Sequence, residues 1–283
     1  MHELRQDHKS LDIMRGWVLG SLFFEPSTRT ASSFNTAMTR LGGDVSQLNA
    51  ETSSHQKGES LEDTIKTMQN YTDVTVMRHP EIGSAARAAA VSGQPVLNAG
   101  DGKGEHPTQA LLDLLCIQEE LKKPSLDGLR VTMIGDLRNG RTVHSLSRLL
   151  SLFDDVTINY VAPNALRMPA EYVKEYDENT SMIQNEMTDY KEALKNTDVV
   201  YMTRVQKERF ENLDEYEACK GMYVLTPEDL VDANPNMAIL HPLPRVDEID
   251  VRVDDDPRAT YFRQAGYGLS TRMALLAMVT GNI

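Results

Sequence analysis

Short apolar runs rich in β-branched residues alternate with longer amphipathic segments along most of the chain. The runs that predict strands are Val18–Phe24, Val74–Met77, Pro95–Asn98, Arg130–Ile134, Val156–Val161, Asp198–Met202 and Ala238–His241. The pattern of Thr28–Leu41 predicts a helix, because its apolar residues recur three and four positions apart. Pro107–Lys122 predicts another helix, with a proline near its start. This alternation predicts parallel sheets with helices on both faces.

A boundary between two such sheets is predicted at Leu121–Gly128, where a charged helix end is followed by Pro, Ser and Gly before a new strand. It divides the chain into two unequal α/β halves. Ligands of parallel sheets bind beyond the carboxyl ends of the strands and between domains. The loops that follow the predicted strands are therefore the candidates for a functional site.

Composition narrows the class of protein. The chain has 283 residues and a formal net charge of -13, which disfavours non-specific binding to nucleic acid or to an anionic membrane. Cys116 and Cys219 form no CxxC pair, so we expect no disulfide framework or structural zinc, and a reducing compartment. The start of the chain lacks the apolar region of a secretory signal, and Met273–Val279 is too short to cross a bilayer. We expect a soluble, cytoplasmic protein.

The loop Phe23–Thr30 (FFEPSTRT) leaves one predicted strand and opens a helix. Three hydroxyls, one guanidinium and the N–H groups of a helix N-terminus would converge there, which suits a phosphate. The alternative has about equal weight: Ser27 only caps the helix and Arg29 is solvated. The segment has no GxxxxGK(S/T) motif, so a nucleoside triphosphatase is disfavoured.

Further candidates follow other strands of both halves. Arg78 comes at the end of a strand, where a plain surface charge is the commoner interpretation. The glycine-rich loop Gly100–Gln109 places His106 and Gln109 at the start of a helix. A histidine at such a junction is a better candidate for chemistry than a lone one elsewhere.

In the second half, Gly135–Thr142 resembles a dinucleotide loop but lacks GxGxxG, so NAD is disfavoured. Arg204 and Gln206 directly follow another strand, and two prolines fix a rigid turn in His241–Arg245. The arginines that stand at strand ends, two in each half, are Arg29, Arg78, Arg141 and Arg204. Cations placed this way in an acidic protein predict a small polyanionic substrate, bound without metal or cofactor.

The same segments resemble the catalytic chains of the aspartate carbamoyltransferase family, in order and in spacing. They are FFEPSTRT, MRHP, NAGDG with HPTQALLDL, GDLRNGRTVHSL, YMTRVQKERF and HPLPRVDEI. The resemblance runs from about Leu11 to the end of the chain. The MTRVQKER and HPLPR segments, with Lys57 in the HQKGES loop, favour aspartate over ornithine, whose enzyme would carry a cysteine-containing HCLP segment.

The resemblance implies transfer of the carbamoyl group of carbamoyl phosphate to the amine of L-aspartate, giving N-carbamoyl-L-aspartate and phosphate in de novo pyrimidine biosynthesis. The fold it implies has two doubly wound parallel-sheet domains of similar architecture. Residues 1–122 would form the carbamoyl-phosphate-binding domain, completed by a C-terminal helix over 266–283, and 123–265 the aspartate-binding domain. A homotrimer with shared active sites is implied, with either a regulatory chain, fused pyrimidine-pathway domains or no regulator.

The family pattern also implies a role for each matching residue. Carbamoyl phosphate would be bound by Ser27, Thr28, Arg29, Thr30, Arg78, His106, Gln109 and the carbonyls of Pro242 and Leu243, with Arg29, Thr30, Arg78 and His106 acting in catalysis. Aspartate would be bound by Lys57, Arg141, Arg204 and Gln206. Ser53 and Lys57 would reach the neighbouring subunit's site, and Glu25 would bridge the domains to Arg141 and Arg209 on closure.

Two features depart from the family pattern. Family chains carry further residues ahead of Leu11 that form a first helix, so we expect a fragment, an excised domain of a multifunctional polypeptide, or a shortened natural form. Gly266–Ser270 places Tyr267 where the family has asparagine. Two other functions remain open: a non-catalytic domain that assembles or docks partners while binding carbamoyl phosphate weakly, and a carbamoyltransferase for ornithine or another amine, which the cations at Lys57, Arg141 and Arg204 disfavour.

Overall fold

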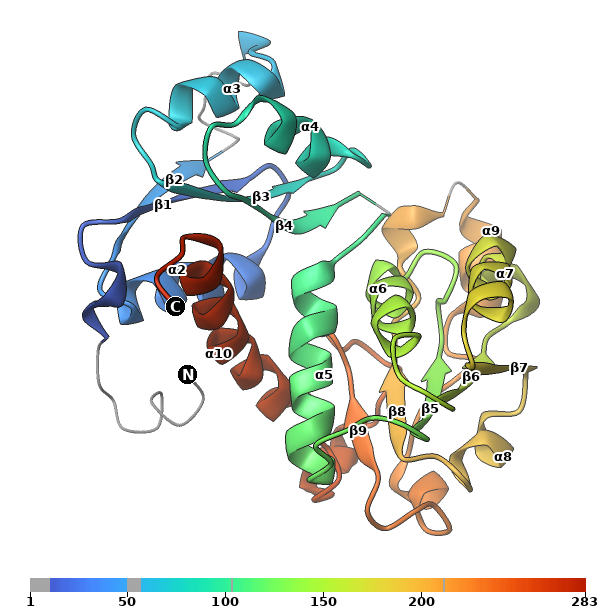
Figure 1. The fold of residues 1–283 in the computed structure, drawn as a ribbon. Helices are drawn as coiled ribbons and strands as arrows, with labels where there is room; N and C mark the ends of the chain where they lie inside the picture. Colours follow the sequence, from blue (N-terminus) through green and yellow to red (C-terminus); the bar gives the residue numbers. More distant parts are fainter. Residues whose placement is uncertain (1–10, 50–56, 103, 211) are drawn as a thin grey trace. The chain divides into compact units, whose positions relative to one another are not determined.

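The computed structural model describes residues 11–49, 57–102, 104–210 and 212–283. These residues form two compact units. The first runs to Thr108 and includes Ala265–Ile283, and the second is Gln109–Gln264. The divisions fall inside helices α5 (Pro107–Leu121) and α10 (Tyr261–Val279), so each of these helices contributes to both units (Figure 1).

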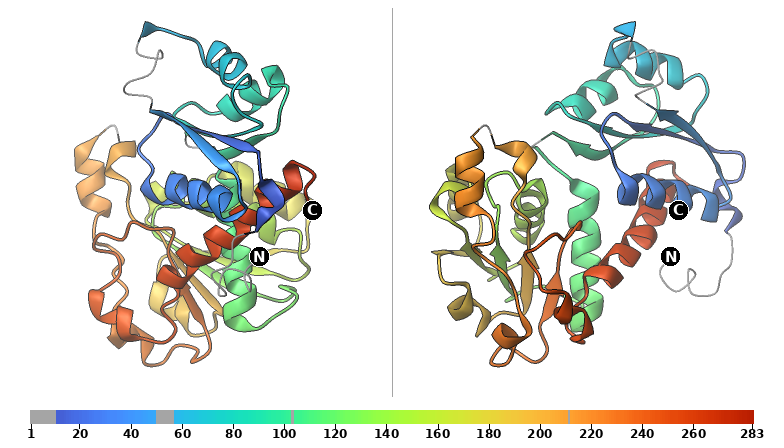
Figure 2. Two further views of the ribbon diagram at one scale, coloured as in Figure 1. Left: turned by 90° about the vertical axis from the view of Figure 1, so that its left-hand side faces the viewer. Right: turned by 180° about the vertical axis from the view of Figure 1, so that it is seen from behind.

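The first unit is built on a parallel sheet of order β2-β1-β3-β4. Its strands are β1 (Val18–Phe23), β2 (Asp44–Asn49), β3 (Val74–His79) and β4 (Val96–Asp101). Its other elements are η1 (Asp12–Met14), α2 (Thr28–Arg40), α3 (Leu61–Met68) and α4 (Ser84–Val91). Helices α3 and α4 cover one face of the sheet, and α2 and α10 cover the other (Figures 1 and 2).

Each face of this sheet has its own apolar core, because successive side chains of a strand point to opposite faces. Val74 and Val76 of β3 join the core that contains Phe34 of α2 and Leu276 of α10, whereas Met77 joins the core of α3 and α4. A fully buried side chain of this size contributes about 1.5–3 kcal/mol. The C-terminal helix thus returns to the N-terminal unit, as the resemblance implied.

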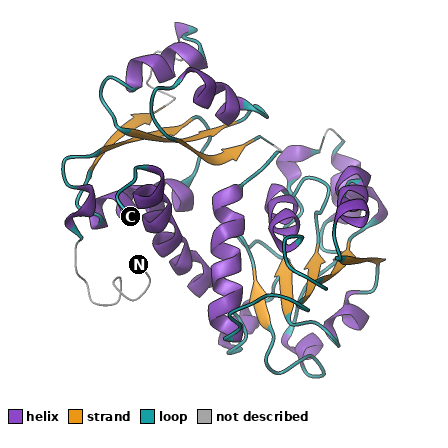
Figure 3. Ribbon diagram, viewed as in Figure 1, coloured by secondary structure: helices purple, strands orange, loops and turns teal. Residues whose placement is uncertain are grey.

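The second unit has a parallel sheet of order β7-β6-β5-β8-β9. Its strands are β5 (Arg130–Ile134), β6 (Thr157–Val161), β7 (Ile183–Met187), β8 (Val199–Met202) and β9 (Ala238–Leu240). Its helices include α6 (Arg141–Leu150), α7 (Ala170–Asn179), α8 (Tyr190–Leu194) and α9 (Leu213–Cys219), with short turns η3 (Asn164–Leu166), η4 (Lys207–Arg209), η5 (Pro227–Leu230) and η6 (Val251–Asp255). In both units strands form a layer flanked by helices (Figure 3), so the predicted α/β class is confirmed.

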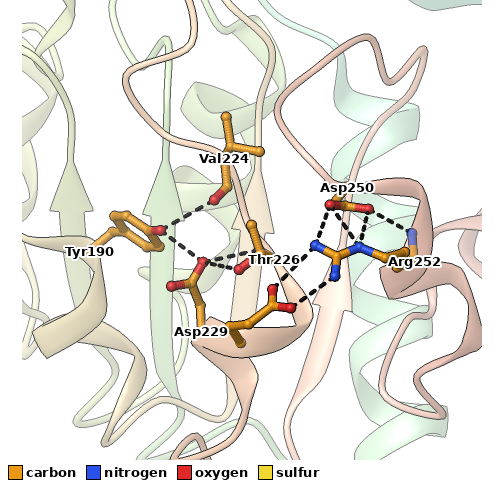
Figure 4. Close-up of polar contacts among 7 residues, drawn as sticks. Tyr190, Val224, Thr226, Asp229, Asp250 and Arg252 are labelled. Carbon is orange, nitrogen blue, oxygen red and sulfur yellow. Dashed lines mark hydrogen bonds and ion pairs between the residues drawn. The ribbon is translucent and has the colours of Figure 1, made fainter.

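A polar cluster fastens η5 to α8 in the second unit. Asp229 accepts from the backbone N–H and the hydroxyl of Thr226, at 3.0 and 2.9 Å, which closes the N-terminus of η5. The hydroxyl of Tyr190 donates to the same carboxylate at 2.8 Å (Figure 4). Arg252 of η6 pairs with Asp250 beside this cluster. None of these contacts involves a residue of the predicted site, so the cluster serves the fold.

Strands β2 and β7 are absent from the sequence-based prediction. Each lies at an edge of its sheet, where one side is not paired. The segment of β2, DVSQLN, is largely polar, and every residue of β7 is exposed or only partly buried. No helix in the described part of the chain is long and apolar enough to cross a membrane.

Candidate functional site

In both units the candidate residues lie where the strand order reverses. From β1 the chain continues to β2 on one side and later to β3 on the other, and β5 stands in the same relation to β6 and β8. At such a switch point the loops leaving two adjacent strands diverge and open a ligand-binding crevice. The loop after β1 and Arg78 at the end of β3 occupy the first switch point. The loops after β5 and β8 occupy the second.

At the first switch point, strand pairing places Arg78 directly beside the loop that follows β1. Phe23 lies opposite Arg78 in the register, and the N–H of Phe24 donates to the Arg78 carbonyl at 2.8 Å. The Arg78 guanidinium then pairs with Glu25, with 3.0 Å between Nε and Oε2, and both side chains are less than 20% exposed. Arg78 is therefore a positioned cation and not a plain surface charge.

The N-terminus of α2 carries the predicted hydroxyls. Ser27 stands at the N-cap with an extended backbone, but its side chain makes no capping hydrogen bond. Ser27 therefore holds the N-cap position without using its hydroxyl to cap the helix, and its role in binding stays a prediction. Thr30 is buried in the first turn of the helix, whereas Thr28 and Arg29 are exposed. This leaves hydroxyls and the positive end of a helix at the same edge of the sheet as Arg78, an arrangement that favours a phosphate.

Asp101 shapes the glycine-rich loop that leads to His106. Its carboxylate accepts from the N–H of Glu105 at 2.9 Å and from the N–H of Gly83 at 3.1 Å. Gly102 has a φ of 57°, and a Cβ there would lie 2.4 Å from the carbonyl oxygen of Pro80. The loop thus needs glycine at this position, and it delivers a 5% exposed His106 immediately ahead of α5.

At the second switch point, a buried carboxylate ties the loop after β5 to the loop after β8. Asp136 is fully buried and accepts from the backbone N–H of Asn139 at 2.9 Å and from that of Gln206 at 3.4 Å. Gln206 Nε2 donates in turn to the carbonyl of Asn139 at 3.2 Å. Burial raises the pKa of the Asp136 carboxyl, against the lowering effect of these hydrogen bonds. Gly135 permits the contact, since a Cβ there would lie 2.2 Å from the Thr203 carbonyl oxygen.

The two arginines of this switch point lie at or just after the two loops that Asp136 connects. Arg141 is the first residue of α6. On the next turn of this helix, Nε2 of His144 is 2.8 Å from the carbonyl oxygen of Leu137. Burial lowers the pKa of His144, so the neutral ring donates this bond at neutral pH. Arg204 pairs with Glu208 through both η nitrogens. Burial opposes ionisation of Glu208, but the hydrogen bonds from Arg204 outweigh it and lower the pKa of that carboxyl.

The loop after β9 is fastened from inside by His241 and Glu248. The Leu243 N–H donates to Nδ1 of His241 at 2.7 Å, so Nε2 carries the ring proton and donates to Glu248 Oε1 at 2.6 Å. Glu248 also accepts from the N–H of Asp247 at 3.1 Å. Burial disfavours the ionised form of Glu248, but the bond from His241 prevails and lowers the pKa of this carboxyl. Pro242 and Leu243, whose carbonyls were singled out, are half-buried in this turn.

The remaining predicted residues belong to other segments of the chain. Ser53 lies outside the described residues, and Lys57 is exposed in a turn. Arg209 is half-buried in η4, and Gln109 begins the second unit, in the first turn of α5. Among the described residues, no group of three or more His, Cys, Asp or Glu side chains is arranged to hold a metal ion.

Sequence reasoning missed the buried carboxylates that hold the loops: Asp101, Asp113, Asp136 and Glu248. The only signal was the position of Asp101 and Asp136 directly at strand ends, which is shared by many solvated aspartates.

Two family models together match most of the chain. The family model described as aspartate/ornithine carbamoyltransferase, carbamoyl-P binding domain, matches residues 1–119, and that of the Asp/Orn binding domain matches residues 127–279. Aspartate carbamoyltransferase, chloroplastic, of Arabidopsis thaliana is 49% identical over 99% of this chain and 72% of its own length. The aspartate carbamoyltransferase catalytic subunit of Methanococcus vannielii is 48% identical over 96% of this chain and 88% of its own length.

Longer relatives and solved structures are similar too. The multifunctional protein CAD of Squalus acanthias is 53% identical over 99% of this chain, and the chain spans 12% of that relative's length. It likewise spans 12% of the multifunctional protein pyr1-3 of Dictyostelium discoideum. The crystal structure of aspartate transcarbamoylase from Trypanosoma cruzi with N-(phosphonacetyl)-L-aspartic acid is 43% identical, with a TM-score of 0.93, covering 98% of this chain and 88% of that one.

Proposed function

The chain belongs to the aspartate/ornithine carbamoyltransferase family, and on that premise we propose that it transfers the carbamoyl group of carbamoyl phosphate to the amine of L-aspartate. The products are N-carbamoyl-L-aspartate and phosphate, in de novo pyrimidine biosynthesis. The observation that carries the proposal is the placement of cations at both switch points, Arg78 in one unit and Arg141 with Arg204 in the other. The solved relatives support it, since one was crystallised with carbamoyl aspartate and phosphate.

Carbamoyl phosphate would be bound through its phosphate at the N-terminus of α2. The hydroxyls of Ser27, Thr28 and Thr30 would donate to the phosphate oxygens there. The guanidinium groups of Arg29 and Arg78 would neutralise its charge. Arg78 is already held in position by Glu25, so part of the entropy lost on binding is lost beforehand.

The reaction needs charge stabilisation more than a protein base. The aspartate amine attacks the carbamoyl carbon, the C–N bond forms and negative charge develops on the carbonyl oxygen. Thr30, Arg78 and His106 would donate to that oxygen, and one such donor is typically worth about 3–4 kcal/mol of transition-state stabilisation. The bond from carbon to the phosphate oxygen then breaks, and the leaving phosphate takes the amine proton. Gln109 and the carbonyls of Pro242 and Leu243 would hold the carbamoyl NH2.

Aspartate would be bound by its two carboxylates. Arg141, Arg204, Gln206 and Lys57 supply three cations and an amide. Three cations disfavour ornithine, because its side-chain ammonium would face like charge. The pairing of Arg204 with Glu208 orients the guanidinium ahead of substrate, with the Arg204 side chain about a quarter exposed.

We propose the assembly and domain arrangement implied by the family pattern. The carbamoyl-phosphate-binding domain is 1–122 with 266–283, and the aspartate-binding domain is 123–265. Three copies would share active sites through Ser53 and Lys57. Closure of the domains would bring Glu25 toward Arg141 and Arg209. Glu25 would then leave its ion pair with Arg78 and pair with these two arginines instead.

The setting of the enzyme is also a proposal. We place it in the cytoplasm, which the two buried free cysteines support. A regulatory chain, fused pyrimidine-pathway domains or no regulator are the three arrangements open to it, and two relatives that are multifunctional proteins by name support the fused form. The net charge of -13 supports the absence of nucleic-acid and membrane partners.

The proposed reaction is tested by measuring phosphate release from carbamoyl phosphate with a sample of known mass. Turnover that depends on L-aspartate supports it, and a preference for L-ornithine overturns the substrate assignment. Binding of carbamoyl phosphate by a folded trimer without turnover would favour the non-catalytic domain instead.

Sharing of sites is tested by mixing Arg29→Ala and Lys57→Ala chains, each inactive alone. In mixed trimers some sites receive both wild-type residues, so partial activity should return. Absence of recovery in verified mixed trimers would refute shared sites.

A further inference from the structure

Asp113 is a fully buried carboxylate of α5 whose partners come from three elements of the second unit. Its Oδ1 accepts from Nε2 of Gln109, one turn earlier on α5, at 2.9 Å. The same oxygen accepts from Nε2 of Gln264 on α10 at 2.6 Å. Its Oδ2 accepts from the hydroxyl of Tyr201 on β8 at 2.8 Å. A carboxylate without access to solvent therefore holds two side-chain amides and one phenol.

The chemistry of these bonds fixes which way the Gln109 amide faces. The Asp113 oxygen it meets is an acceptor, so Gln109 must turn its NH2 group toward it. The carbonyl oxygen Oε1 of Gln109 then points away from Asp113 and is available as an acceptor. Burial, followed by the charge of Asp113, raises the pKa of the Tyr201 hydroxyl, which keeps its proton and remains a donor.

A second line of contacts runs from Asp113 to the loop after β9. Gln264 gives its NH2 to Asp113, and its Oε1 accepts from the backbone N–H of His241 at 2.9 Å. His241 is the residue directly before Pro242 and Leu243, and its own Nδ1 accepts from the Leu243 N–H. Both ends of the Gln264 amide are used, so its orientation is fixed as well.

We propose that Asp113 is a positioning residue that aims the acceptors for the carbamoyl NH2 group. It sets Gln109 Oε1 directly, and it sets the carbonyls of Pro242 and Leu243 through Gln264. The inference rests on the proposed function, in which these three oxygens receive the NH2 group. Its consequence is selectivity: oriented acceptors favour an NH2 group over a methyl group, which donates nothing.

The test compares carbamoyl phosphate with acetyl phosphate, in which CH3 replaces NH2, and with inorganic phosphate. Asp113→Leu should reduce the preference for carbamoyl over acetyl phosphate roughly tenfold, the equivalent of about one hydrogen bond. Its affinity for inorganic phosphate should stay unchanged, because the phosphate residues of the first unit are untouched. Dissociation constants are measured by titration calorimetry on the full chain.

Two further variants separate positioning from stability. Asp113→Asn should keep the preference, because its amide oxygen can still accept from both glutamines while its NH2 donates to the Tyr201 oxygen. Tyr201→Phe is the matched control: it removes one buried hydrogen bond from Asp113 but leaves both glutamine bonds. It should lower the unfolding temperature and leave the preference unchanged.

The outcomes are distinct. An unchanged preference in Asp113→Leu overturns the inference, and so does equal weakening of all three ligands, which marks a structural role. The inference is also overturned if Asp113→Asn loses as much of the preference for carbamoyl over acetyl phosphate as Asp113→Leu does. If Asp113→Leu does not fold, Gln264→Met replaces it and should lower the preference several-fold. An unchanged preference in Gln264→Met would refute the second line of contacts. A wild-type chain that does not bind carbamoyl phosphate refutes the proposed function itself.

Discussion

Replacing Glu248 with glutamine tests how the loop after β9 is held. Oε1 of Glu248 faces the Nε2–H of His241, and Oε2 faces the N–H groups of Asp247 and Val246 at 3.1 and 3.3 Å. A glutamine NH2 must take one of these two positions, so either the imidazole or the backbone donors then face another donor. A buried donor without an acceptor costs about 1–3 kcal/mol. For a unit of this size, each kcal/mol lowers the unfolding midpoint by about 2–4 °C.

The effect of Glu248→Gln should depend on pH in a defined direction. The pKa of Glu248 is lowered from its ordinary value of 4.5, since the bond from His241 outweighs the effect of burial. The advantage of the wild type is therefore complete above the unfolded-state pKa and is lost as the pH falls through the lower folded-state pKa. Denaturant unfolding of both chains between neutral pH and the acid limit of folding measures the difference. A constant difference across that range, or none at neutral pH, would refute the reasoning.

Two further changes test the second switch point. Gly135→Ala should lower the free energy of unfolding by about 3 kcal/mol or more, because φ is 118° and the new Cβ would meet the Thr203 carbonyl. The control Gly221→Ala, also at positive φ but with nothing within 4 Å, should lower it by about 1–2 kcal/mol. Denaturant unfolding compares the two variants. Arg204→Ala should raise the KM for aspartate about a hundredfold or more and leave that for carbamoyl phosphate nearly unchanged. Lys207→Ala, an exposed neighbour, is the kinetic control.

The interior strands were predictable because burial on both faces demands continuous apolar runs. Strand β8, VVYM, is buried along its whole length, and the sequence places it to within one residue. Strand β7, IQNEM, has a polar middle and an exposed face, so no apolar period marks it. A polar edge strand of this kind forms because its neighbour β6 offers hydrogen-bond partners, and that neighbour lies elsewhere in the sequence. The edge strand β9 was predictable because it is apolar and buried.

The residues of the candidate site also fall into those that a local sequence pattern indicates and those that only the fold brings together. Arg78 and Arg204 could be proposed from the sequence because a cation at the end of a strand is a local pattern. Asp113 could not be found, since its partner Gln264 is 151 positions away and its own segment resembles an ordinary amphipathic helix. A single sequence records which residues are polar, but not which polar residues meet.

These buried carboxylates also explain how an acidic chain can present sites for anions. Asp136, Asp113 and Glu248 are each at most 5% exposed. Asp136 and Glu248 accept hydrogen bonds from backbone N–H groups of the loops, and Asp113 accepts from side-chain amides of helices α5 and α10. The hydrogen bonds of these carboxylates hold in place the loops that follow β5, β8 and β9. The arginines that follow these strands are left partly exposed to bind the substrate. Loops fastened in advance lose less conformational entropy when substrate binds, and donors held in place need no reorganisation in the transition state. The acidic residues therefore support anion binding because they act on the backbone behind the cations.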